Sequence, residues 1–348
     1  MARDRFPLKL LLVGFGNVGR ELARILVNRP DYPALGDLDV SVVGITTGSR
    51  KSLANAYGVD LARALRELGE HGRFTPANPD YSELDSLGAA ETLNYDVLVE
   101  MSPLSIATRG EPAISHVRTA LERGRHVITC NKGPLAFGYR ELRRLADERH
   151  AGFLYETTVM DGSPVFGMAR SCMKGNTILK IDGILNSTSN YVLCAMEKGS
   201  SFAEGVAGAQ AEQIAEADPS NDLDGWDASV KIVALANVLM GAGLEPKDVD
   251  RDSMAGITPE RVREAKERGF RIKMVCSAWR EGGSVRASVK ATEVPLGHPF
   301  ALVDATGSIV RFETDLLGKI LMTEEDPNIT TTAYGVITDL YSLDAGIR

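Results

Sequence analysis

Short apolar runs alternate with amphipathic stretches along the first half of the chain. The runs that predict strands are LKLLLV near the N-terminus, LDVSVVGI (38–45), YDVLVEM (95–101) and HVITC (126–130). Apolar residues at helical spacing predict helices over 111–124 and over 139–150. Strands that alternate with helices in this way predict an α/β domain built on a parallel, doubly wound sheet.

The pattern changes after about residue 155. ILKIDGILN, FRIKMVCSAW and SVRASVKATEV predict strands with several helices between them, hence an α+β domain with a mixed or antiparallel sheet. The tail TTTAYGVITDLYSL (330–343) predicts a helix that packs back on the first domain. We therefore expect a first domain over 1–154, a second over 155–328, and a C-terminal helix over about 329–348 that belongs with the first.

Composition narrows the classes of function. With 44% hydrophobic and 25% charged residues, the chain has the make-up of a folded globular protein. A net charge of −8 disfavours nucleic acid and anionic membranes as partners, and the longest later apolar stretch, 232–244, is too short to span a bilayer. The four cysteines are scattered without a CxxC pair, which predicts reduced thiols, no zinc site and a cytoplasmic location.

A glycine-rich motif follows the first predicted strand and opens a helix. The sequence GFGNVG comprises Gly14, Phe15, Gly16, Asn17, Val18 and Gly19. In a dinucleotide site the first glycine permits a tight turn, the second lets the backbone approach a pyrophosphate, and the third allows close packing of helix on strand. The strand, motif and helix together predict a nucleotide site at the helix N-terminus. The alternative is a turn that merely needs glycines.

The stretch after the second predicted strand bears on the choice of cofactor. NAD sites carry an acid here, which binds the ribose hydroxyls. This chain has TTGSRK instead, with Arg50 and Lys51. Two cations favour a 2′-phosphate, and hence NADP over NAD; the alternative is that both are solvated loop residues.

Lys132 lies in NKGPLA (131–136), directly after the strand HVITC. Ligands of open parallel sheets bind beyond the carboxyl ends of the strands. Lys132 is therefore predicted to lie where cofactor meets substrate, with a solvated surface lysine as the alternative.

Carboxylates gather in EADPSNDLDGWDASVK (216–231), ahead of a single lysine, Lys231. Asp224 and Asp227 have the spacing of a helix capping box, and from Trp226 onward the pattern is that of a largely buried helix. Asp227 and Lys231, four residues apart, would share one face of it. This makes Lys231 a candidate proton donor.

Two further acids, Glu216 and Asp222, precede that helix. They would suit an ammonium group on a small substrate. The alternative for the whole stretch is a salt-bridged surface loop.

These stretches together resemble the homoserine dehydrogenase family. The matches run along most of the chain: GFGNVG, HVITCNKGPLA, YETTVMDGSP, GILNSTSNYVL and, most specific, AEADPSNDLDGWDASVK. The resemblance implies a Rossmann dinucleotide-binding domain, an α+β catalytic and dimerisation domain, and a homodimer. It also implies reversible NAD(P)-dependent interconversion of L-homoserine and L-aspartate 4-semialdehyde, in threonine and methionine biosynthesis.

The resemblance assigns roles to matching positions. Lys231 matches the proton donor, Lys132 the lysine between nicotinamide and substrate, and Ser102 a cofactor contact. The positions that match substrate-binding residues or partners of the lysine are Glu216, Asp222, Asp227 and Thr188. The positions whose backbone carbonyls would hold a monovalent cation such as Na⁺ are Glu156, Val159, Asp161 and Ser163.

The chain also departs from the family pattern. Gln213 and Ile214 stand where Gly-Tyr is usual, Ser187 replaces a glycine in NSTSN, and TEEDPN (323–328) replaces a glycine-rich run that helps close over the cofactor. A paralogous dehydrogenase for a related hydroxy or semialdehyde amino acid is therefore an alternative. A thiol-dependent aldehyde dehydrogenase using Cys130 is another, and a nucleotide-binding sensor without catalysis is a third. Because the chain stops near residue 348, we expect no C-terminal regulatory domain and no threonine feedback through one.

Overall fold

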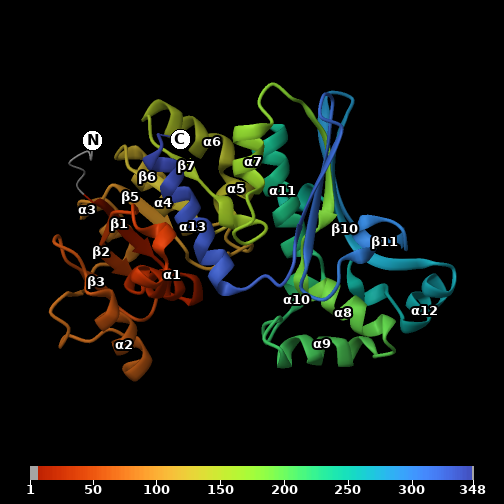
Figure 1. Cartoon of the computed structure of the whole chain (residues 1–348), viewed down its shortest axis with the longest axis horizontal. Coiled ribbons are helices and arrows are strands. Elements are labelled where there is room, and N and C mark those ends of the chain that lie inside the picture. Colours follow the sequence, from red (N-terminus) through yellow and green to blue (C-terminus); the bar gives the residue numbers. More distant parts are fainter. Residues whose placement is uncertain (1–6, 347–348) are drawn as a thin grey trace. The chain divides into compact units, whose positions relative to one another are not determined.

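The computed structural model describes residues 7–346, which divide into two compact units (Figure 1). Unit 1 takes its described residues from Met1–Pro164 and Asn328–Arg348, and unit 2 is Val165–Pro327. The first residues of the predicted first domain (1–6) and the last two of the predicted C-terminal helix (347–348) lie outside the described residues.

Unit 1 is built on a sheet with the strand order β4-β3-β2-β1-β5-β6-β7. Its strands are β1 (Leu8–Val13), β2 (Val40–Thr46), β3 (Ser52–Ala54), β4 (Tyr81–Ser82), β5 (Val97–Glu100), β6 (His126–Thr129) and β7 (Phe153–Leu154). The run from β2 through β1, β5 and β6 to β7 is parallel, which confirms the predicted doubly wound sheet. The edge strands β3 and β4 pair antiparallel, an addition that the sequence did not predict.

The burial of the central strand β1 explains why its sequence is continuously apolar rather than alternating. Leu10, Leu11, Leu12 and Val13 are all fully buried. Because successive side chains of a strand point to opposite faces, both faces of the sheet must be covered there. These residues belong to the core of unit 1.

Helices flank this sheet, and the last helix of the chain is one of them. The helices of unit 1 are α1 (Asn17–Val27), α2 (Leu61–His71), α3 (Ser86–Thr92), α4 (Ala113–Glu122), α5 (Gly133–Phe137), α6 (Tyr139–Glu148) and α13 (Ile329–Asp344). Figure 1 shows α13, in blue, alongside α1, and its buried Val336, Ile337 and Leu340 join the core of unit 1. Helix α13 is therefore part of unit 1.

Unit 2 contains a second sheet, with the strand order β13-β12-β8-β10-β11-β9. Its strands are β8 (Ile178–Ile184), β9 (Asp250–Arg251), β10 (Phe270–Glu281), β11 (Ser284–Pro295), β12 (Ser308–Thr314) and β13 (Lys319–Glu324). Neighbours pair antiparallel except β9 with β11, so the sheet is mixed, the first of the two predicted possibilities (mixed or antiparallel). Thr323 and Glu324, the first residues of TEEDPN, belong to β13 rather than to a loop.

The helices of unit 2 are α7 (Val165–Cys172), α8 (Ser187–Glu197), α9 (Phe202–Ala211), α10 (Ser220–Leu223), α11 (Trp226–Met240) and α12 (Pro259–Glu267). Helix α11 is buried on most sides, as predicted, and contacts β8, β10 and β11. The predicted capping box is wrong: Gly225, in the left-handed conformation with φ 72°, precedes α11, and no side chain caps it. The Asp224 carboxylate accepts a hydrogen bond from the Ser253 hydroxyl instead.

Two further properties concern the described residues. No helix among residues 7–346 is both long and apolar enough to cross a membrane. The four cysteines are free thiols: Cys130, Cys172, Cys194 and Cys276.

Candidate functional site

The turn after β1 has the geometry that a dinucleotide site requires. Gly14 has φ 94°, and a Cβ there would lie 2.6 Å from the carbonyl carbon of Met101. A Cβ on Gly16 would meet no atom within 4 Å, whereas one on Gly19 would lie 2.7 Å from the Gly14 carbonyl oxygen. Gly14 thus serves the tight turn and Gly19 the close packing of α1 on the turn. Gly16 leaves open space in front of the helix.

The other residues of the motif leave the N-terminus of α1 open to an anion. Phe15 is buried and packs against Phe74, with ring centroids 6.2 Å apart. Asn17 begins α1, and its side-chain oxygen accepts a hydrogen bond from Arg20. No side chain caps α1, and its first turn, which includes Val18, carries no acid. The N–H groups and positive dipole end of α1 are therefore available to a phosphate.

The loops after β5 and β6 are tied together at the same carboxyl edge of the sheet. The Ser102 N–H and hydroxyl donate to the buried Glu100 carboxylate. The Asn131 amide donates to the Ser102 carbonyl at 2.9 Å and accepts from the Gly133 N–H at 2.8 Å. Lys132 lies between these contacts, half-buried, at the start of α5. Ser102 and Lys132 are thus held at one edge, close to the order change at β1 and β5 where doubly wound sheets bind ligands.

The two cationic residues in the loop after β2, Arg50 and Lys51, make different contacts. The Arg50 N–H donates to the Thr47 hydroxyl oxygen at 2.7 Å, and the Arg50 side chain is exposed. The Lys51 ammonium lies 2.7 Å from a Glu83 carboxylate oxygen, which raises the pKa of Lys51. Both side chains are exposed, but Lys51 already pairs with an acid of unit 1.

In unit 2 the structure brings Asp222, Asp227 and Lys231 into one hydrogen-bonded cluster around Asn186. The Asn186 amide nitrogen donates to Asp222 at 2.8 Å and to Asp227 at 3.0 Å. The Lys231 ammonium donates to the Leu185 carbonyl at 2.7 Å and lies 3.6 Å from Asp227. The predicted pairing of Asp227 with Lys231 on one helical face is confirmed.

Thr188 completes this cluster from the first turn of α8. Its hydroxyl donates to the second oxygen of Asp222 at 2.8 Å. Burial and the neighbouring Asp227 carboxylate raise the pKa of Asp222, against the effect of the Asn186 and Thr188 hydrogen bonds. A proton is therefore held more readily at Asp222 than at an ordinary aspartate.

Glu216 does not join the cluster in this structure. It is exposed, and its backbone carbonyl accepts a hydrogen bond from the Gln210 side chain at 3.1 Å. Within residues 7–346, no hydrogen bond or ion pair links its carboxylate to Asp222, Asp227 or Lys231.

Asn186 is the functional-site residue that the sequence reasoning missed. It lies 36 and 41 residues before the carboxylates that it bridges, so no local pattern links them. The available signal was its position at the head of NSTSN, at the end of the predicted strand ILKIDGILN.

The thiol alternative loses its chemical basis. Burial raises the pKa of the Cys130 thiol to about 12. A nucleophilic cysteine needs a thiolate at working pH, usually through a lowered pKa. Cys130 is partly buried and packs against the main apolar cluster of unit 1.

The loop predicted to hold a cation offers neutral oxygen donors. Glu156 and Val159 are buried, and Asp161 has φ 42°. The Asp161 carboxylate accepts from the Thr332 hydroxyl at 2.7 Å. The predicted cation donors are the backbone carbonyls of Glu156, Val159, Asp161 and Ser163. Backbone carbonyls suit a hard cation. Among residues 7–346 no group of three or more His, Cys, Asp or Glu side chains is arranged to hold a metal ion.

Comparisons with known proteins cover both units. Residues 14–156 match the family described as homoserine dehydrogenase, NAD binding domain, and residues 164–341 match the family described as homoserine dehydrogenase. The chain is 37% identical to an NAD(+)-dependent homoserine dehydrogenase of Pseudomonas canavaninivorans, with 95% of each chain covered. It is 33% identical to a homoserine dehydrogenase of Methanocaldococcus jannaschii, with 96% of this chain and 97% of the other covered. A hyperthermophilic archaeal homoserine dehydrogenase solved in complex with NADPH superimposes with a TM-score of 0.82 at 26% identity, covering 99% of each chain.

Proposed function

The chain belongs to the homoserine dehydrogenase family, and from that premise we propose that it interconverts L-homoserine and L-aspartate 4-semialdehyde with NAD(P) as the hydride carrier. The observation that carries the proposal is the cluster of Asp222, Asp227 and Lys231 around Asn186. In this partly buried cluster the lysine can protonate the substrate oxygen on which negative charge develops. The two carboxylates can bind the substrate's ammonium group.

Lys231 is the proposed acid–base residue. Bound NAD(P)H supplies the hydride that reduces the aldehyde carbon. Negative charge then builds on the aldehyde oxygen, and the Lys231 ammonium donates the proton that neutralises it. The Leu185 carbonyl and Asp227 hold this ammonium in place, so no reorientation is needed at the moment of transfer. In the oxidative direction a proton is released, so we expect faster oxidation at alkaline pH.

Asp222, Asp227 and Glu216 are the proposed partners of the substrate ammonium. Thr188 and Asn186 act as positioning residues, because their donated hydrogen bonds orient Asp222. Glu216 would contribute from the exposed loop before α10, where its carboxylate is accessible.

Unit 1 is the proposed cofactor-binding part, with the glycine turn, Ser102 and Lys132 as contacts. We further propose that NADP binds more tightly than NAD. The support is Arg50, an exposed guanidinium after β2, where an NAD site would place an acid. We expect Lys51 to contribute less than Arg50, because Lys51 already pairs with Glu83.

A monovalent cation such as Na⁺ is proposed at the carbonyls of Glu156, Val159, Asp161 and Ser163. Such an ion would stiffen the loop that leads from β7 towards α7. Replacing Na⁺ and K⁺ in the buffer by a bulky organic cation should lower the thermal stability of the loop-bearing unit 1, and re-addition of Na⁺ should restore it.

The assembly, location and domain limits are proposed from the family and the composition. We propose a homodimer, acting in the cytoplasm on small molecules, with a cofactor domain over 1–154, a catalytic and dimerisation domain over 155–328, and the helix over about 329–348 as part of the first. The free cysteines are compatible with a reducing compartment.

A spectrophotometric assay of nicotinamide reduction tests the function. L-Homoserine should be oxidised faster than L-serine, which is one carbon shorter, and faster than 4-hydroxybutanoate, which lacks the ammonium group. The paralogous alternative predicts the opposite order, with another hydroxy amino acid preferred because of Gln213, Ile214 and Ser187. No turnover of any hydroxy acid would instead support the sensor alternative.

A further inference from the structure

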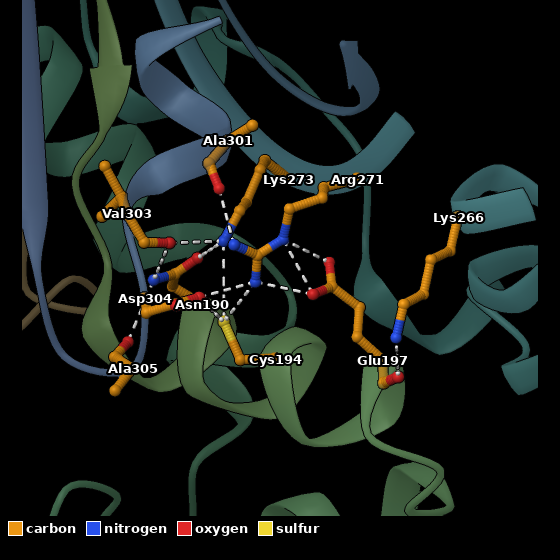
Figure 2. A network of polar contacts seen from close by, with 10 residues as sticks. All are labelled: Asn190, Cys194, Glu197, Lys266, Arg271, Lys273, Ala301, Val303, Asp304 and Ala305. Carbon is orange, nitrogen blue, oxygen red and sulfur yellow. Dashed lines mark hydrogen bonds and ion pairs between the residues drawn. The ribbon is translucent and has the colours of Figure 1, made fainter. Parts of the chain in front are cut away.

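Unit 2 buries a lysine for which the proposed reaction has no use. Lys273, in β10, is fully buried. Its ammonium nitrogen donates to the Asn190 side-chain oxygen at 2.7 Å and to the Val303 carbonyl at 2.6 Å, and lies 3.6 Å from the Cys194 sulfur (Figure 2). A buried lysine is normally paired with a carboxylate. Asn190, Val303 and Cys194 are instead neutral partners.

The nearby carboxylates are taken by a different cation. Arg271 donates to both oxygens of Glu197, and it donates to Asp304 at 2.6 Å (Figure 2). Burial therefore lowers the pKa of Lys273, and the neutral, nucleophilic amine becomes more populated than for a surface lysine.

Cys194 is held against that amine by its helix. The residues of α8 that bond the loop before β12 are spaced to share one face: Ser187 bonds the Thr306 carbonyl, Asn190 the Ala305 carbonyl, and Cys194 the Asp304 carboxylate. The Cys194 sulfur also lies 3.3 Å from an Arg271 nitrogen. The Arg271 guanidinium beside the sulfur favours the negative charge that develops when the thiol reacts with an oxidant.

We propose that Lys273 and Cys194 are a redox modification site, at which peroxide joins the lysine nitrogen to the cysteine sulfur. In the first step the Cys194 thiol attacks hydrogen peroxide, which gives a sulfenic acid and one water. In the second step the Lys273 amine attacks the sulfenic sulfur, an S–N bond forms, and the hydroxyl leaves as a second water with one amine proton. The thiol is oxidised by two electrons, the peroxide is reduced to water, and the linked pair has lost two hydrogens.

A small oxidant has a route to this sulfur. Cys194 is 4% exposed, and the Asp304 side chain that bonds it is 66% exposed. Movement of one surface carboxylate would uncover the sulfur to a molecule as small as peroxide. The reaction should therefore be slower than oxidation of the exposed Cys172.

The link would join α8 to β10, and thus fasten the helix whose first turn holds Asn186 and Thr188. A covalent bond between residues distant in sequence restricts the unfolded chain, so unit 2 should unfold at a higher temperature when the link is present. A thiol reductant should attack the S–N bond, release the amine and restore the free cysteine.

Peptide mapping by mass spectrometry tests the proposal on the intact chain. A Cys172→Ser variant, which removes the exposed thiol, is treated with increasing hydrogen peroxide, alkylated and digested with trypsin. We expect a cross-linked pair of peptides containing Cys194 and Lys273, lighter by two hydrogens than the sum of the reduced peptides and uncut at Lys273. It should disappear after dithiothreitol, together with the rise in unfolding temperature.

A Lys273→Met variant is the matched control, because methionine keeps the length and apolar stem without the amine. Its Cys194 should accumulate sulfenic acid that dimedone traps, without any link. The proposal is overturned if wild-type Cys194 becomes sulfinic acid, or stays unmodified, while the Lys273 peptide remains cleavable. This outcome is measured in protein that retains both Cys194 and Lys273, so it does not depend on whether Lys273→Met folds.

Discussion

At the residue scale, one amide organises the candidate site. Asn186 donates to Asp222 and Asp227, and its side-chain oxygen accepts from the Ser189 N–H at 2.8 Å, which caps α8. The amide therefore bridges the two carboxylates, of which Asp227 also pairs with Lys231. The closeness of Asp227 and Lys231 could be predicted, because four residues on a helix fix it. The role of Asn186 could not, because its partners lie on other elements.

The raised pKa of Asp222 leads to a prediction about stability. Its protonated form is favoured in the folded state, so its contribution is present at low pH and is lost as pH rises through the folded pKa. Asp222→Asn does not titrate at this position. The free energy of unfolding of the variant, minus that of the wild type, should therefore increase as pH rises from below the usual aspartate pKa to above the raised value.

Urea unfolding at a series of pH values measures that difference. Asp218→Asn is the control, since hydrogen bonds from Ser220 lower the pKa of the exposed Asp218, and its difference should change with pH in the opposite direction. A difference for Asp222→Asn that does not vary with pH would mean that Asp222 is ionised as easily as any surface aspartate.

Arg50 carries the prediction on cofactor preference. A charge-assisted contact to a 2′-phosphate contributes about 1.5–3 kcal/mol, or roughly 10- to 150-fold in affinity. Arg50→Ala should therefore raise the Kd for NADP by that factor and leave the Kd for NAD almost unchanged. Fluorescence titration of both cofactors measures this.

Lys51→Ala is the matched control for Arg50. Because Lys51 already pairs with Glu83, its removal should change the Kd for NADP much less. Equal affinities for both cofactors in the wild type, unaltered in Arg50→Ala, would show that the loop after β2 does not contact the adenosine ribose.

At the element scale, α11 shows where sequence spacing misled. The D-x-x-D spacing suggested a cap by Asp224, but the chain enters α11 through a left-handed Gly225. This conformation brings the position close to another loop, since a Cβ on Gly225 would lie 3.1 Å from the Asp252 carbonyl oxygen. The glycine was visible in the sequence; the neighbouring loop, which makes it necessary, was not.

Gly225→Ala should therefore destabilise the protein more than a positive φ alone requires. An L-residue in the left-handed region costs about 1–2 kcal/mol, to which the contact with Asp252 adds. Gly241→Ala, at the other end of α11 with φ 67° and no atom within 4 Å of its Cβ, isolates the conformational cost. Equal losses in the free energy of unfolding for the two variants would show that the Asp252 loop yields without cost.

At the scale of the whole molecule, the α/β unit was the more predictable. Its strands are continuous apolar runs and its turn carries glycines with separate geometric roles, so pattern and motif agree. The short edge strands β3 and β4 have too few residues to show a period. In unit 2 the class of sheet was predictable, but the strand order and the Lys273 network arise from contacts between distant segments.

The measurement that tests the account most directly is the turnover of Lys231→Met with L-homoserine, compared with the wild type and with Lys247→Met, a surface lysine control that is 65% exposed. Loss of the proposed proton-transfer group should lower kcat by about 10²- to 10⁴-fold. The Kd for NADP should stay unchanged, because Lys231 belongs to unit 2 and the proposed cofactor contacts belong to unit 1. A Lys231→Met enzyme that is folded, binds NADP and turns over homoserine at the wild-type rate would contradict the assignment of Lys231 as the acid–base residue.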